Sequence, residues 1–299
     1  TLVLGSNTAL GLGALNAAAG TTLDASTSVS LSNQVNIAGA LTVAGSANIA
    51  LTGTVNGAGS LTKSGSAALT LNGANGYSGG TTLNAGTLVL GHVGALGSGA
   101  LTVDGGVVQT SVNGLTLNNL VSLGAGGLRV YGSNDMSLSS AVSGAGGLTM
   151  GGTGRLTLGT ANTYAGGTTL NDGTLILGDA SALGTGALTV DGDSALSTTG
   201  ALSVGNDVDL LANLTVTGAQ PLTLRGDIGG TGGLIKSGAE TLTLSGANTY
   251  SGGTTISAGT LQGNTASLTG NIANGALLVF DQVGTGTYAG VLSGGGALS

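Results

Sequence analysis

The chain has 299 residues, including 62 glycines, one proline and no cysteine, and it carries a formal charge of −7 at pH 7. Its 40% hydrophobic and 6% charged residues exclude an intrinsically disordered chain, which combines low hydrophobicity with high net charge. Five scattered Lys and Arg residues cannot form the basic surface that phosphate backbones require, so we expect no nucleic-acid partner.

Three long similar stretches follow one another along the chain. They are Leu69–Gly91, Leu156–Gly178 and, with an altered end, Leu242–Gly263. A fixed period of this kind predicts a solenoid, in which each repeat packs on its neighbours. The connecting segments repeat as well, since GALTVDG occurs at 99–105 and again at 186–192. The sequence therefore predicts a single solenoid built from units of about 86 residues, namely 1–86, 87–173, 174–259 and a partial unit 260–299.

Both ends of the chain fall inside this pattern. Thr1–Gly5 matches Thr87–Gly91, and Gly294–Leu298 resembles the opening of a further unit. We therefore expect both ends to be cut within a repeat.

Within each unit, apolar and polar residues alternate over three to five positions, as in Leu69-Thr70-Leu71. Alternation with period two places Leu and Val on the inner face of a strand and Thr on the outer face. Such short strands, separated by glycine-rich corners, suit coils of about 20–25 residues that stack in parallel. The predicted fold is an all-β parallel β-helix, a β-solenoid of roughly 13–14 rungs.

The corners between strands need backbone with positive φ, which Gly adopts freely and Asn tolerates best among the other residues. Asn75, Asn162 and Asn248 occupy the same corner of successive units. We expect their side-chain amides to bind backbone groups of the turns.

The motif G-x-G-x-L-x-K-x-G…L-T-L-x-G-A-N-x-Y-x-G-G-T-T-x-x-x-G-T-L appears at Gly57–Leu88 and Gly230–Leu261, and less completely at Gly144–Leu175. It resembles the passenger-associated repeat of Gram-negative autotransporters of the diffuse-adherence adhesin type. The segment 259–290 resembles another common passenger segment. The resemblance implies a right-handed β-helix that is secreted to the bacterial cell surface through the outer membrane. It also implies a C-terminal membrane barrel outside this segment, with no membrane insertion by the segment itself.

One short motif is a candidate receptor site. Arg225-Gly226-Asp227 spells the tripeptide that integrins recognise, although three-letter matches also arise by chance. The alignment of Gly226 with Gly53 places the tripeptide at the entry to a strand, where a receptor would reach it less easily than on an extended loop.

Other candidate sites have simpler interpretations. His92 is the only histidine, and a catalytic triad would need partners to orient it. The pairs Asp191/Asp193 and Asp207/Asp209 would each lie on one strand face, where two carboxylates could act on a polysaccharide. Asp191 and Asp193 could also hold Ca²⁺. A solvated strand face is the alternative, because the corresponding positions of the preceding unit are not both acidic. We therefore expect no catalytic, cofactor or metal site.

The sequence as a whole predicts a non-enzymatic structural or adhesive segment of an autotransporter passenger. Its expected role is adhesion, autoaggregation or biofilm contact, through host-cell or bacterial surface receptors or through self-association. The alternatives are a stalk without its own binding site and a polysaccharide-cleaving β-helix enzyme. Flat threonine ladders on β-helices can also order ice, but the connecting segments interrupt the threonine pattern that this function requires.

Overall fold

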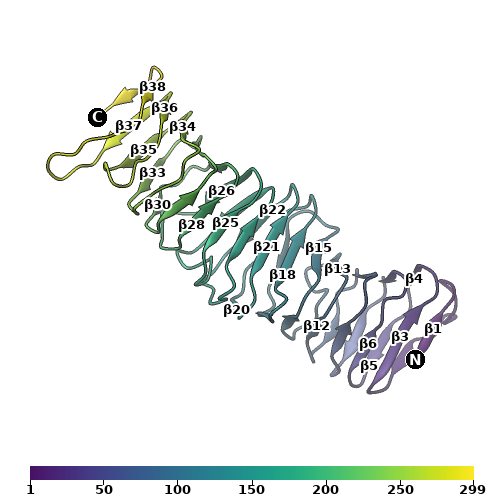
Figure 1. Ribbon diagram of the computed structural model, residues 1–299. Helices are drawn as coiled ribbons and strands as arrows, with labels where there is room; N and C mark the ends of the chain where they lie inside the picture. The colour runs from purple at the N-terminus through teal and green to yellow at the C-terminus, as the bar shows by residue number, and fades with distance from the viewer. The chain divides into compact units, whose positions relative to one another are not determined.

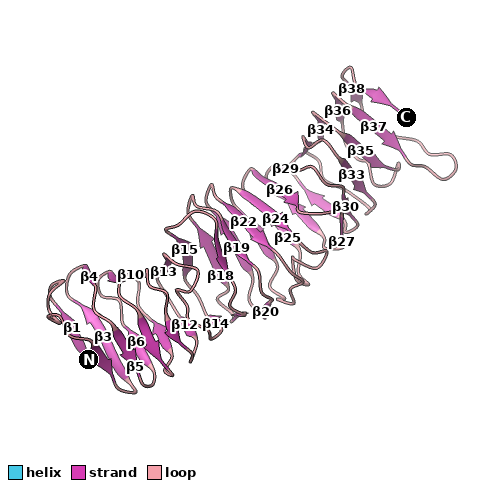
Figure 2. Ribbon diagram, turned by 180° about the vertical axis from the view of Figure 1, so that it is seen from behind, coloured by secondary structure: helices cyan, strands magenta, loops and turns pink.

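The computed structural model describes residues 1–299 and contains strands and loops but no helix (Figure 2). The strands pair in parallel and form a β-solenoid of about 15 turns. The predicted all-β parallel β-helix is therefore confirmed. The number of turns exceeds the predicted 13–14 because paired residues such as Leu23, Val43 and Lys63 follow one another at the short end of the expected coil length.

The chain divides into two compact units, one of residues 1–148 with 164–166 and the other of 149–163 with 167–299. The predicted boundaries of the 86-residue repeats stay a prediction.

In the first unit, successive coils add short parallel strands to several stacks (Figure 1). An eight-stranded sheet consists of β1 (Leu2–Leu4), β3 (Thr21–Ala25), β6 (Leu41–Val43), β9 (Leu61–Lys63), β12 (Thr81–Leu83), β14 (Leu101–Val103), β17 (Val121–Leu123) and β20 (Val142–Gly144). A four-stranded sheet consists of β2 (Leu15–Ala17), β5 (Val35–Ile37), β8 (Val55–Gly57) and β11 (Gly76–Tyr77). A third stack contains β4 (Val29–Leu31), β7 (Ile49–Leu51), β10 (Ala68–Leu71), β13 (Thr87–Leu90), β15 (Val107–Thr110) and β18 (Leu128–Tyr131), and β16 (Leu115–Leu117) pairs with β19 (Met136–Leu138).

The second unit repeats this arrangement. One stack contains β23 (Thr168–Leu170), β25 (Leu188–Val190), β28 (Val208–Leu210) and β31 (Ile228–Gly230). Another contains β22 (Arg155–Leu158), β24 (Thr174–Leu177), β26 (Ser194–Thr198), β29 (Leu214–Val216), β32 (Leu234–Lys236), β34 (Thr254–Ile256), β36 (Ile272–Asn274) and β38 (Leu292–Ser293). A six-stranded sheet consists of β27 (Leu202–Val204), β30 (Leu222–Leu224), β33 (Thr241–Leu244), β35 (Thr260–Gly263), β37 (Leu277–Phe280) and β39 (Ala297–Leu298). The strand β21 (Leu148–Gly151) begins at the last residue of the main segment of the first unit.

The core consists of aliphatic columns that run from coil to coil. Leu69 pairs with Leu88 in the next coil, and both side chains are fully buried. Thr70, between the buried Leu69 and Leu71, is half-buried and faces outward. The predicted alternation of inner Leu and outer Thr is confirmed here. Burial of a Leu side chain contributes about 1.5–3 kcal/mol, so the stacked columns are a main source of stability.

The corners use glycine for its backbone freedom. Gly80 has φ 82° and Gly86 has φ 74°, and no other residue type in the chain has a positive φ. Asparagine, which tolerates this conformation best among the other residues, does not adopt it here.

Asparagine acts in the corners through its side chain. Asn75 Oδ1 accepts a hydrogen bond from Val55 N at 2.8 Å, and Asn75 Nδ2 donates one to Ala95 O at 2.6 Å. The equivalent Asn248 bonds Ile228 N at 2.8 Å and Ser267 O at 2.6 Å. The predicted role of these amides in binding turn backbone is confirmed, and each amide links three consecutive coils.

Two repeated polar groups lie within the core. Tyr77 is fully buried, and its hydroxyl lies 2.5 Å from Thr81 Oγ1. Tyr250 makes the same contact with Thr254 Oγ1 at 2.7 Å. Burial raises the pKa of Tyr77 and of Tyr250 to about 12, although the hydrogen bond to each threonine opposes the rise.

Lys63 is the second polar group within the core. It occupies the inner column between Val43 and Leu83 and is fully buried. Its Nζ donates hydrogen bonds to Ser64 O at 2.8 Å, Gly65 O at 2.7 Å and Ala85 O at 3.3 Å. Burial lowers the pKa of this ammonium below its usual 10.5. The charge is thus stabilised by carbonyl groups of two successive corners rather than by a carboxylate.

Tyr77→Phe and Tyr250→Phe should each make the free energy of unfolding fall less as the pH rises into the alkaline range. The pKa of each phenol is about 12 when folded and 10.0 ordinarily, so the unfolded chain loses these protons first. The resulting stability is complete below pH 10 and falls as the pH rises through 12, by about 3 kcal/mol per tyrosine. Denaturant unfolding from neutral pH up to this range measures the effect.

At neutral pH the same variants should lose about 1 kcal/mol, because a hydroxyl–hydroxyl bond is removed. Tyr131→Phe is the control, since Tyr131 is exposed. An equal alkaline loss of stability in wild type and in the Tyr77→Phe variant would contradict the assignment.

Lys63→Met should be tolerated far better than Lys63→Ala. Met150 occupies the matching position of the next repeat and is buried there, so a methionine fits the column without the ammonium. Truncation to alanine should cost about 2–5 kcal/mol through the cavity that it leaves, whereas the methionine variant should lose less than about 1.5 kcal/mol. Denaturant unfolding of both variants provides the comparison.

Stability of the wild type should also rise with pH in the window below 10.5, because the unfolded chain there holds the proton that the folded lysine releases. Lys63→Met should show a smaller rise. If Lys63→Met and Lys63→Ala lost the same stability, the hydrogen bonds from the ammonium to the carbonyls would contribute more to stability than the packing of the side chain, which would contradict this prediction.

Candidate functional site

The tripeptide Arg225-Gly226-Asp227 forms the corner between β30 and β31. Arg225 and Asp227 are exposed, while Gly226 is buried. A Cβ atom on Gly226 would lie 2.2 Å from the carbonyl oxygen of Asn206 in the preceding coil. No side chain fits in that space, so the stacking of the coils accounts for the glycine of the tripeptide.

The Asp227 carboxylate is bonded to the next coil. Its Oδ1 accepts a hydrogen bond from Ala247 N at 2.7 Å, and the Asp227 amide donates one to Asp207 Oδ1 at 2.9 Å. Aspartates at successive corners thus form a ladder in which each carboxylate binds the backbone one coil further on. The structure brings the three predicted residues together in a stacked corner, and their receptor binding stays a prediction.

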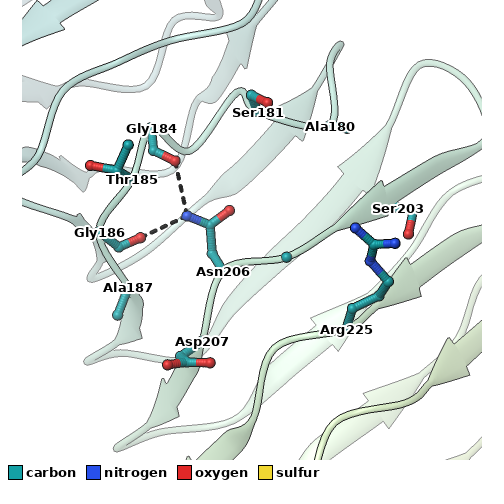
Figure 3. A pocket seen from close by; sticks show the side chains of 11 residues that line it. Ala180, Ser181, Gly184, Thr185, Gly186, Ala187, Ser203, Asn206, Asp207 and Arg225 are labelled. Carbon is teal, nitrogen blue, oxygen red and sulfur yellow. Dashed lines mark hydrogen bonds between the residues drawn. The ribbon is translucent and has the colours of Figure 1, made fainter.

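An open hollow of about 430 Å³ lies beside Arg225 in the second unit. Figure 3 shows the guanidinium next to Ser203 at one end, with Asn206 and Asp207 further along. The lining is mainly polar and also includes Gly205. The remaining residues come from the turn that precedes β25: Ala180, Ser181, Gly184, Thr185, Gly186 and Ala187.

Asn206 holds this turn in place. Its Nδ2 donates hydrogen bonds to Gly184 O at 3.1 Å and Gly186 O at 2.7 Å (Figure 3). We call this arrangement the asparagine clamp.

The same clamp occurs twice in the first unit. Asn33 Nδ2 bonds the carbonyls of Gly11 and Gly13, and Asn119 Nδ2 bonds those of Gly97 and Gly99, at 2.7–3.0 Å. The sequence analysis missed these residues. Their signal is an Asn-x-Val that follows each Ala-Leu-Gly-x-Gly segment by a constant interval.

The other candidate residues lie apart from the hollow or have structural partners. His92 is exposed, and its Nδ1 accepts a hydrogen bond from Gly94 N at 3.0 Å within its own turn. The expectation that Asp191 and Asp193 share a strand face is wrong, because both lie in the corner between β25 and β26. Asp193 Oδ1 instead accepts a hydrogen bond from Asn213 N at 2.9 Å.

No three His, Asp or Glu side chains gather closely enough to hold a metal ion. No helix of sufficient length and hydrophobicity to span a membrane is found.

Comparison with known proteins matches the family model of the passenger-associated-transport repeat at residues 61–90, 143–177 and 234–262. The chain is also 42% identical over 84 residues to the Adhesin BmaC autotransporter of Brucella suis biovar 1 (strain 1330). That similarity covers 27% of this chain and 2% of the relative, so the chain spans only a small part of the relative's length. No solved structure matches. The three matched repeats, the solenoid that contains them and the similarity to an adhesin confirm the resemblance seen in the sequence: the chain carries passenger-associated-transport repeats and is similar to part of an autotransporter adhesin.

Proposed function

We propose that this chain is a surface-displayed, non-enzymatic passenger segment that mediates adhesion or autoaggregation through a ladder of outward hydroxyl groups. The supporting observation is a column in the eight-stranded sheet of the first unit. In this hydroxyl ladder, side chains in register on successive coils are Thr22, Thr42, Thr62, Thr82, Thr102, Ser122 and Ser143. Six of the seven are half-buried and Ser122 is exposed.

The chemistry of the hydroxyl ladder suits many weak contacts. Parallel strands lie about 4.8 Å apart, so the ladder offers a regular row of groups that both donate and accept hydrogen bonds. Each bond contributes about 0.5–1.5 kcal/mol, which is too little for binding alone. Display of many copies on one surface would make the combined contact strong.

The autotransporter relative supports this role, because its name describes it as an adhesin. We extend the proposal to secretion through the outer membrane and to contact with host-cell or bacterial surfaces, including a second copy of the chain. A stalk without its own binding surface is the alternative.

The variant Thr42→Val/Thr62→Val/Thr82→Val tests the proposal by removing three adjacent hydroxyls while keeping the β-branched shape. With the 299-residue chain coupled to beads, adhesion to epithelial cells and matrix proteins and bead-to-bead aggregation are measured. The triple variant should reduce at least one of these by about tenfold or more, as expected from the loss of several hydrogen bonds.

The matched control is Thr70→Val/Thr116→Val/Thr157→Val, because these half-buried outward threonines lie outside the hydroxyl ladder. An equal loss in the control would contradict a role for this column. Loss of cell binding in Asp227→Ala, with the triple variant unaffected, would transfer the activity to the tripeptide. If the wild type bound nothing, the proposal would fail and the alternative, a stalk without its own binding surface, would stand.

A further inference from the structure

The hollow beside Arg225 interrupts a framework that the chain otherwise repeats. The three asparagine clamps at Asn33, Asn119 and Asn206 place equivalent residues around three similar turns. Comparison of the residues next to each clamp therefore shows what is particular to the third. A feature that occurs once on a repeating scaffold is not needed for stacking.

The first difference among the three clamps is the residue immediately before the clamp asparagine. It is Ser32 in the first case, Asn118 in the second and Gly205 in the third. Asn118 Oδ1 accepts a hydrogen bond from Ser139 Oγ at 2.6 Å, so its side chain covers this position and reaches the next coil. A Cβ atom on Gly205 would meet no atom within 4 Å. The hollow is therefore open where the second clamp carries an amide side chain.

The second difference is the residue at the equivalent position one coil after each clamp. The amides of Thr52, Ser139 and Arg225 each donate to the carbonyl two residues before their clamp, at 2.8, 3.1 and 2.8 Å, which makes the three positions equivalent. Thr52 Oγ1 and Ser139 Oγ bond back to those same carbonyls at 3.1 Å. Arg225 replaces these inward-bonded hydroxyls with an exposed guanidinium that lines the hollow.

A guanidinium favours a carboxylate, which it can bind through two parallel hydrogen bonds. The net charge of −7 and the nearby Asp207 and Asp227 oppose small, fully charged anions. They favour a ligand with one negative group at the Arg225 end and hydroxyl groups elsewhere. The hydroxyls of Ser181 and Thr185 and the carboxylate of Asp207 offer partners for such hydroxyls. The volume of about 430 Å³ lies within the usual range for small-ligand sites.

We infer that this hollow binds a carboxylate-bearing sugar unit, with the sugar carboxylate on Arg225 and its hydroxyls toward Ser181, Thr185 and Asp207. The inference rests on the proposed function in that a surface-displayed chain would encounter acidic polysaccharides. It assigns Arg225 a role as a carboxylate-binding residue, independent of the receptor motif of which it is the first residue.

Titration of the 299-residue chain with glucuronic acid, followed by saturation-transfer NMR, tests the inference. Saturable binding is expected, with glucose at least tenfold weaker because it lacks the carboxylate. Arg225→Gln should weaken glucuronic acid binding by tenfold or more, and Arg225→Lys should lie between this variant and the wild type. Gly205→Asn, which introduces the residue of the second clamp, should also weaken binding tenfold or more without changing the charge.

Arg129→Gln is the matched control, because Arg129 is an exposed arginine on β18 in the first unit. It should leave the affinity unchanged. Equal binding of glucose and glucuronic acid, an equal effect of Arg129→Gln, or no saturable binding would overturn the inference. Equal binding of glucose 6-phosphate would show a general anion site and overturn the sugar-carboxylate assignment. The bead assay of the hydroxyl ladder does not depend on Arg225, so the two proposals can fail separately.

Discussion

The close approach of backbone between successive coils is the constraint on which the rest of this structure depends. At several corners a Cβ atom would lie about 2 Å from a carbonyl of the coil before, as at Gly59, Gly126 and Gly226. Only glycine fits such positions, whatever its φ angle. The high glycine content is therefore set by contact between coils as much as by turn conformation, and the repeat preserves these contacts along the chain.

Corners that pack so tightly leave backbone groups outside the strand ladders, and buried groups of this kind must find partners. The chain supplies them with a small set of side chains. Asn75 and Asn248 bind amides and carbonyls of neighbouring coils, the asparagine clamps bind carbonyl pairs, and Lys63 binds three carbonyls with one ammonium. Burial of that ammonium costs free energy unless it is hydrogen-bonded. Its presence inside an aliphatic column is consistent with the number of carbonyls that it satisfies.

Much of this fold could be predicted from the sequence, because its rules are local. Alternation identified Leu69 and Leu71 as core residues, and recurrence identified Asn75 as a corner residue. Alternation also places Lys63 on the same face as Leu61, but its charge argues for solvent, and only the carbonyls of Gly65 and Ala85 explain the inward position. The hollow could not be predicted, since Gly184, Asn206 and Arg225 meet only when three coils are stacked. The prediction that Asp191 and Asp193 share a strand face was wrong because strands and corners have similar sequence patterns over so few residues.

The two proposed binding surfaces follow from opposite uses of the same stacking. Where coils repeat faithfully, equal side chains form columns such as the hydroxyl ladder, whose contacts are individually weak and gain strength only by number. Where one coil departs from the repeat, as at Gly205 and Arg225, the unchanged framework around it holds a single group in a defined position. A uniform solenoid can only present the first kind of surface. Substitutions outside the corner contacts, which leave the stacking intact, are therefore the route by which such a scaffold acquires a specific ligand without losing its fold.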